Sequence, residues 1–363
     1  MKVGIVGMPN AGKSSLFNAL TKAGAEAANY PFTTIEPNVA IVPVHDERMV
    51  KLSELLKSKE VVWDTIAFHD IAGLVRGASE GEGLGNKFLA NIRETDAIVH
   101  VVRAHHDDGI LHSEGSVDPA RDVETIETEL IYSDLEQAER RHERVLKGAR
   151  GGDKELTAEQ KWLEGIIAAL QEGKSVRTAL VDHPVPDLAP NALRDLSPLT
   201  IKPVLFVANV DEGTDEVPPE IQAHADAIGA KAVAISSRLE AELAEMDEED
   251  AAEMRADLGV SQSGLDRVSQ GAFALLDQIT FFTAGEGTIA QTWHMRDGLS
   301  AWHAAGAIHT DIQKGFVRAE VIGWDALLDA GGFAGARDRG TLRLEGRDYV
   351  MRDGDVINVK FTP

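Results

Sequence analysis

The stretch Gly7-Met8-Pro9-Asn10-Ala11-Gly12-Lys13-Ser14 decides the fold of this chain. It matches the pattern G-x-x-x-x-G-K-[ST], follows the apolar run 3–6 and precedes residues 15–20, which are typical of a helix. A glycine-bounded loop between a strand and a helix turns backbone N–H groups toward an anion, and the helix N-terminus adds positive charge. Lys13 would then reach the β and γ phosphates of a nucleotide, and the Ser14 hydroxyl would bind magnesium. A glycine-rich turn that binds nothing would not require these two side chains.

The composition limits the class of protein. The chain has 363 residues, which is enough for two or three domains. It has no cysteine, which excludes disulfides, cysteine-ligated iron–sulfur clusters and cysteine zinc sites. It has no apolar leader and no run of eighteen apolar residues, so we expect a cytoplasmic protein without a membrane partner.

The charge is strongly acidic and unevenly spread. A formal charge of −24 argues against indiscriminate binding to a nucleic-acid backbone, and we expect no DNA partner. Residues 281–363 hold nine Lys or Arg against eleven Asp or Glu, a net of −2, so the other 280 residues carry −22. If any face meets RNA, the C-terminal segment is the better candidate.

Six short runs rich in β-branched residues predict strands buried on both faces of a sheet. They are residues 3–6, 39–44, 65–69, 97–102, 203–209 and 231–236. Most are joined by predicted helices, which indicates an α/β fold, a doubly wound P-loop sheet with its ligand at the carboxyl ends of the strands. The short link from the second run to the third leaves room for one antiparallel pair.

Two further segments predict additional domains. Apolar residues at three- and four-residue spacing in 119–147 and 156–180 favour an inserted antiparallel helical hairpin, a coiled-coil-like arm, although ordinary surface helices on the sheet would show a similar stripe. From about residue 279, strands at 318–322 and 355–361 and a hairpin at 341–350 predict a small α+β module. The predicted domains are 1–118 with 200–278 for nucleotide binding, 119–199 for the helical insertion, and 279–363.

The end of the third strand predicts a magnesium and switch site. Asp70 begins the pattern D-x-x-G, so its carboxylate would hold magnesium through a water and the Gly73 N–H would contact the terminal phosphate. The segment 29–37 lies where a first switch would be, and one of its threonines could complete the metal coordination. Thr34 is the first choice, partly from the resemblance described below, and Thr33 is the second.

The base-recognition motif is altered. GTPases commonly read guanine with N-K-x-D, whereas the fifth strand here ends in Asn209-Val210-Asp211-Glu212. The longer Glu212 carboxylate would be displaced from the guanine donors, and a donor left without its partner costs about 1–3 kcal/mol. We therefore predict ATP over GTP, with Ser236 supporting the base from the other side. Alternatively, Asp211 takes the guanine-reading role.

The residue after D-x-x-G is unusual for hydrolysis. Ras-like enzymes have a water-orienting glutamine there, whereas this chain has Leu74, which cannot hydrogen-bond water. A histidine of the loop 103–112, a monovalent cation such as K⁺ near Asn10, or an arginine from a partner could replace it.

Taken together, the motifs resemble the YchF (Obg-like ATPase) family of P-loop proteins over essentially the full length. The likeness rests on residues 7–15, 29–38, 70–78 and 209–212 and, in the C-terminal part, on 282–285, 305–311, 314–321 and 353–356, which look like that family's TGS (β-grasp-like) domain. The resemblance implies a nucleotide domain with an inserted coiled coil and a TGS module. It also implies a preference for ATP, magnesium and ribosome binding.

The resemblance also assigns residues. It implies a switch threonine at Thr34, a catalytic histidine at His112, and nucleotide contacts at Asn10, Ala11, Gly12, Lys13, Ser14, Ser15 and Val210. One departure is Thr33, where relatives often carry cysteine, so thiol-based redox control cannot operate here.

Three functions remain open on the sequence. The first is a slow magnesium-dependent ATPase that acts as a conformational switch when bound to the ribosome. It would contact the large subunit or the whole particle and its RNA, and act as a monomer. The second is an ATP-liganded binding module with negligible hydrolysis, which Leu74 keeps open. The third is an ordinary Obg-type GTPase.

Overall fold

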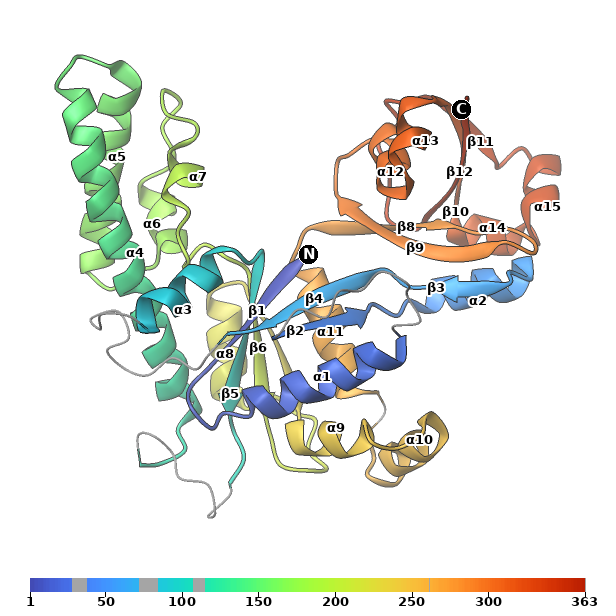
Figure 1. Cartoon of the computed structure of the whole chain (residues 1–363), viewed down its shortest axis with the longest axis horizontal. Coiled ribbons are helices and arrows are strands. Elements are labelled where there is room, and N and C mark those ends of the chain that lie inside the picture. The colour runs from blue at the N-terminus through green and yellow to red at the C-terminus, as the bar shows by residue number, and fades with distance from the viewer. Residues whose placement is uncertain (28–37, 72–83, 107–114, 261, 363) are drawn as a thin grey trace. The chain divides into compact units, whose positions relative to one another are not determined.

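The computed structural model describes residues 1–27, 38–71, 84–106, 115–260 and 262–362. They form two compact units, one of Met1–Ile41 with Ala67–Ala272 and the other of Val42–Ile66 with Phe273–Pro363 (Figure 1). The three predicted domains stay a prediction. The compact units differ from them because Val42–Ile66, predicted to belong to the nucleotide domain, groups with the C-terminal residues.

The first unit is built on a six-stranded sheet in the order β2-β4-β1-β5-β6-β7. Its strands are β1 (Lys2–Val6), β2 (Val39–Pro43), β4 (Thr65–Asp70), β5 (Ala97–Arg103), β6 (Val204–Asn209) and β7 (Lys231–Ile235). Strands β4, β1, β5, β6 and β7 pair in parallel, which confirms the doubly wound P-loop fold. All seven residues of β5 are buried, as its apolar sequence predicts.

Helices cover this sheet (Figure 1). They are α1 (Lys13–Ala27), α3 (Leu84–Arg93), α8 (Pro219–Ala227), α9 (Ser237–Leu243) and α11 (Gly264–Ala274), while α10 (Glu248–Asp257) packs on α9. Helix α9 begins at the end of β7, where the Ser236 hydroxyl accepts the N–H of Leu239 as an N-cap.

The insertion is a helical arm with two kinds of contact. Helix α4 (Pro119–Ala149) and α5 (Lys154–Gln171) lie side by side, followed by α6 (Val176–Asp182) and α7 (Ala192–Leu196) (Figure 1). Near its start, α4 packs Ile126 and Leu130 on the sheet, and farther along it packs Ala138 and Val145 on α5. Both alternatives from the sequence therefore apply, each to one part of α4. The predicted segment 156–180 is not one helix, because it breaks at Gly173, whose φ is +79°.

The chain returns from the arm to the sheet at Leu199 and Thr200, which Asp134 of α4 binds. This carboxylate is fully buried and accepts the N–H groups of Leu199 and Thr200 at 2.7 and 2.8 Å and the Thr200 hydroxyl at 2.7 Å. Burial raises the pKa of Asp134, while these bonds and the nearby Arg93 act in the opposite direction. The contacts fix the return point because an unpaired buried carboxylate would be costly.

The second unit is a six-stranded sheet in the order β11-β10-β12-β8-β9-β3. Its strands are β3 (Glu60–Val62), β8 (Gln278–Thr283), β9 (Ile289–Arg296), β10 (Phe316–Gly323), β11 (Arg343–Glu345) and β12 (Asp355–Phe361). Its helices are α2 (Glu47–Leu56), α12 (Ala301–Ile308), α13 (Thr310–Lys314), α14 (Trp324–Asp329) and α15 (Phe333–Asp338). The predicted hairpin at 341–350 is wrong, since only 343–345 is a strand and it pairs with β10.

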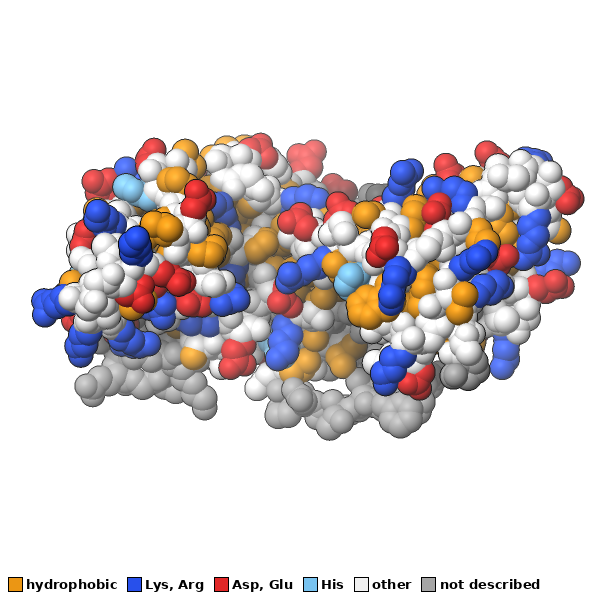
Figure 2. Space-filling model, turned by 90° about the horizontal axis from the view of Figure 1, so that it is seen from above, with side chains coloured by type: hydrophobic (Ala, Val, Ile, Leu, Met, Phe, Trp, Pro, Cys, Tyr) orange, Lys and Arg blue, Asp and Glu red, His pale blue; other side chains and the backbone are white. Residues whose placement is uncertain are grey.

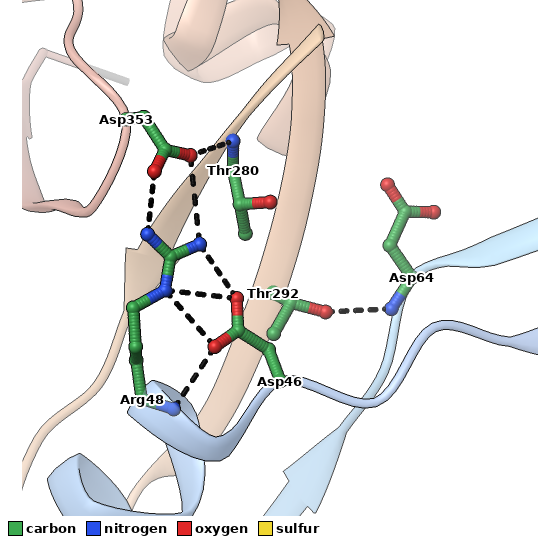
Figure 3. A network of polar contacts seen from close by, with 6 residues as sticks. All are labelled: Asp46, Arg48, Asp64, Thr280, Thr292 and Asp353. Atoms are coloured by element: carbon green, nitrogen blue, oxygen red, sulfur yellow. Dashed lines mark hydrogen bonds and ion pairs between the residues drawn. The ribbon is translucent and has the colours of Figure 1, made fainter. Parts of the chain in front are cut away.

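The segment between β2 and β4 is held in this second unit by polar contacts (Figure 3). Arg48 pairs with Asp46 at 2.7 Å and with Asp353 at 2.5 Å, and Asp353 also accepts the Thr280 N–H at 2.9 Å. Strand β3 runs parallel to β9. The predicted short link is therefore a helix and a strand, which the sequence analysis missed.

His100 in β5 predicts a pH dependence of stability. Its side chain is buried beside Phe206, and burial, followed by the charges of His224 and Lys13, lowers its pKa to about 3. An unfolded histidine titrates near pH 6.5, so below that pH the unfolded chain takes up a proton that the folded chain refuses. We expect His100 to cost about 1.4 kcal/mol of unfolding free energy per pH unit as the pH falls from about 6.5 toward 3.

Denaturant unfolding between pH 4 and 8 tests this expectation. Because His100→Leu removes only this titration, its stability should fall less steeply with acid than that of the wild type, and His100→Phe should do the same. Equal slopes for all three proteins would contradict the assignment.

Candidate nucleotide-binding site

The loop from β1 to α1 requires glycine at both ends. A Cβ on Gly7 would lie 2.3 Å from the carbonyl oxygen of Val101, and a Cβ on Gly12 would lie 2.2 Å from Nδ2 of Asn209. Gly12 also has φ +101°, which L side chains rarely adopt. The two glycines of the motif therefore let the loop pack against the neighbouring strands β5 and β6.

Lys13 lies inside this loop. Its Nζ donates to the carbonyl oxygens of Gly7 at 2.9 Å and Met8 at 2.7 Å, and the residue is 8% exposed. Burial lowers the pKa of Lys13 to about 8, while the charge of Asp70 opposes the shift. The ammonium therefore stays largely protonated at neutral pH, as phosphate binding requires.

Asp70 lies near Lys13, at the end of the strand β4 that neighbours β1. It ends β4 and pairs in register with Ile5 near the carboxyl end of β1. Burial raises the pKa of Asp70, and the charge of Lys13 opposes this shift. A second cation would favour the ionised carboxylate further, and hydroxyl and carboxylate oxygens are the donors that Mg²⁺ prefers. Ser14 and Asp70 thus carry the types of oxygen donor that suit a magnesium ion.

Asn209 joins the phosphate loop to the base-recognition motif. Its Nδ2 donates to the carbonyl oxygen of Ala11 at 3.0 Å, and its Oδ1 accepts the Ser237 N–H at 2.9 Å. Its own carbonyl oxygen accepts the Ala104 N–H at 2.9 Å and lies 3.1 Å from Nδ1 of His105. One buried side chain thus holds the loop after β1, the end of β6 and the start of α9 in a fixed relation.

These elements enclose a cavity of about 740 Å³, within the usual range for small-molecule sites. The predicted nucleotide-binding residues on its wall are Asn10, Gly12, Lys13, Ser14, Ser15, Asn209, Val210, Glu212 and Ser236. Ala11 is not part of the wall because it is buried behind it and binds Asn209. His105 and His106 of the predicted histidine loop and Asp211 of the base motif also line the cavity.

Other predicted residues lie outside the described part of the chain. They are Thr33, Thr34, Gly73, Leu74 and His112. The sequence patterns did not predict that α9 contributes part of the cavity wall. Arg238, Ala241 and Glu242 of α9 line the cavity, as does Glu245 in the turn after it. The three- and four-residue spacing of the helical residues is the signal that could have found them.

Comparison with known proteins shows what the chain is related to. It is 47% identical to the "Ribosome-binding ATPase YchF" of Haemophilus influenzae, over 99% of both chains. The chain belongs to the YchF family. The protein of the same name in Bacillus subtilis is 45% identical over 99% of both chains. The solved structure of the Schizosaccharomyces pombe YchF GTPase matches with a TM-score of 0.85 at 37% identity, covering 99% of this chain and 97% of that one.

Two family models also match. Residues 2–137 match a family described as "50S ribosome-binding GTPase", and residues 278–362 match the YchF-type GTPase C-terminal domain, described as a protein of unknown function. The resemblance inferred from the sequence motifs is thereby confirmed. In the described part of the chain, no helix combines the length and apolar character needed to span a bilayer.

Proposed function

We propose that this YchF family member binds ATP in the cavity, hydrolyses it, and uses the cycle as a switch on the ribosome. The observation that carries the proposal is the pair of hydrogen bonds that the Asn209 side chain makes with Ala11 and Ser237. They hold the phosphate loop against a base motif that ends in Glu212. The names of the relatives support hydrolysis and ribosome binding. They disagree on the nucleotide, since the fission yeast relative is called a GTPase.

ATP is the proposed substrate because of Glu212. A glutamate in place of the aspartate carries its carboxylate one methylene farther out, and its Oε1 lies 3.4 Å from Nε of Arg238. Guanine presents two donors at the edge that this residue would face, and leaving a donor unpaired costs about 1–3 kcal/mol. Adenine lacks those donors and does not suffer this loss. Asp211 also lines the cavity, so an Obg-type GTPase is the second candidate.

Magnesium is the proposed cofactor. The Ser14 hydroxyl would bind it directly, Asp70 would hold it through a water, and Thr34 would complete the shell. The ion neutralises charge that develops on the phosphates during transfer. A K⁺ ion near Asn10 could add to this neutralisation.

Hydrolysis is proposed to depend on His112, because Leu74 follows the D-x-x-G motif where a glutamine would orient the water. We propose slow turnover of the isolated protein for the same reason. The other candidate, an ATP-liganded module that does not hydrolyse its ligand, is distinguished by a single-turnover assay with and without ribosomes. Release of phosphate from bound ATP in either condition supports the enzyme, and ATP recovered intact in both would leave only the binding module.

The partner surfaces are proposed to be the helical arm and the C-terminal unit of a cytoplasmic monomer. On the face in Figure 2, Lys and Arg side chains stand beside Asp and Glu side chains rather than in a purely acidic field. Mixed charge permits contact with ribosomal RNA and protein despite the overall charge of −24. Cosedimentation with ribosomes, in the presence of ATP or ADP, tests the association.

A further inference from the structure

The cavity wall carries its positive charge at two separate places. Among the described lining residues, the Lys and Arg side chains are Lys13, in the phosphate loop, and Arg238, in the first turn of α9. Four carboxylates line the same cavity: Asp211, Glu212, Glu242 and Glu245. Because Lys13 already supplies the positive charge that would bind the phosphates, we expect a different role for Arg238.

Arg238 lies against the end of the base motif. Its Nε is 3.4 Å from Oε1 of Glu212 and 3.2 Å from Oε1 of Glu242, one helical turn farther along α9. Its neighbour Ser237 donates to Asn209 and so ties this turn to β6. The Arg238 side chain is 77% exposed, so its guanidinium is open to a ligand while it contacts both carboxylates.

We propose that Arg238 is a specificity-determining residue that covers the purine base and holds the Glu212 carboxylate away from the edge of guanine. This inference rests on the proposed function, because it assumes a purine nucleotide in the cavity. A planar guanidinium stacks on an aromatic ring and attracts its π face. The same guanidinium pairs with Glu212, the carboxylate at the fourth position of the base motif.

The two actions have different effects on the two purines. Stacking on the ring stabilises adenine and guanine alike, because both have a π face. Pairing with Glu212 disfavours guanine alone, because its N1–H and 2-amino donors need a carboxylate that is already engaged. Arg238 should therefore contribute to affinity for both nucleotides and to the preference for ATP.

Calorimetric titration with magnesium and ATP, GTP or inorganic triphosphate tests this proposal. In Arg238→Ala, affinity for ATP should fall by about fivefold through lost stacking. Affinity for GTP should fall less or rise, because Glu212 is released, and affinity for inorganic triphosphate should not change. Arg238→Lys keeps the charge without the planar group, so it should lose the stacking contribution but keep most of the preference. Arg144→Ala, which removes an exposed arginine from α4, is the matched control.

A double-mutant cycle isolates the action through Glu212. In the Glu212→Gln background, Arg238→Ala should lower the affinities for ATP and GTP by the same factor. An unchanged ATP preference in Arg238→Ala, or an equal loss for inorganic triphosphate, would overturn the proposal. If the wild type binds no ATP, the proposed function itself fails. If the wild type prefers ATP over GTP and Arg238→Ala shows the same preference, only this inference fails.

Discussion

Lys13→Ala is expected to lower the affinity for ATP by about 30-fold or more, since truncating a buried, charged partner of a ligand typically costs about 2–5 kcal/mol. Lys13 is buried in the phosphate loop, with its Nζ on two loop carbonyl oxygens and its charge facing Asp70. No other Lys or Arg of the described cavity wall belongs to this loop. Calorimetric titration with ATP and magnesium measures the loss.

The control for this prediction is Lys51→Ala, which removes an exposed lysine of α2. It should bind ATP like the wild type. Thermal unfolding of both variants shows whether the fold is kept. If folded Lys13→Ala retained wild-type affinity, the phosphates would not lie in this loop.

His112→Ala is expected to slow the hydrolysis of bound ATP by roughly 100-fold, the effect typical of losing a positioned general acid or base. Affinity for ATP should change little, because the resemblance assigns this histidine to the reaction and not to binding. Single-turnover phosphate release and calorimetric titration measure the two quantities separately.

The matched control is His142→Ala, which removes a histidine of the helical arm. It should leave both quantities unchanged. Unaltered turnover in His112→Ala would remove this histidine from the mechanism and leave His105 or His106, K⁺ or a partner's arginine as the means of orienting the water.

The sequence predicted the nucleotide sheet well because its signals are local. Each buried parallel strand is a short run of β-branched residues, and the loop at residues 7–14 marks where the first strand meets its helix. Strand β3 was missed for the opposite reason. It is three residues long, and its partner β9 lies more than 200 residues away, so nothing in its own sequence specifies the pairing.

The site divides in the same way. The part of the site for the phosphates is formed by one contiguous motif, whereas the part for the base is formed by β6 and α9. The hydrogen bond from Ser237 to Asn209 joins residues 28 positions apart, and it brings Arg238 to Glu212. A pattern of single residues does not reveal such a contact, because it depends on the spacing of two strands and the start of a helix.

The central claim is that this cavity selects ATP. Calorimetric titration of the purified full chain with ATP and GTP, at the same magnesium concentration, tests it most directly. We expect binding of one ATP per chain and an affinity for GTP lower by about tenfold or more, as for a guanine donor without its partner. Tighter binding of GTP than of ATP would contradict it.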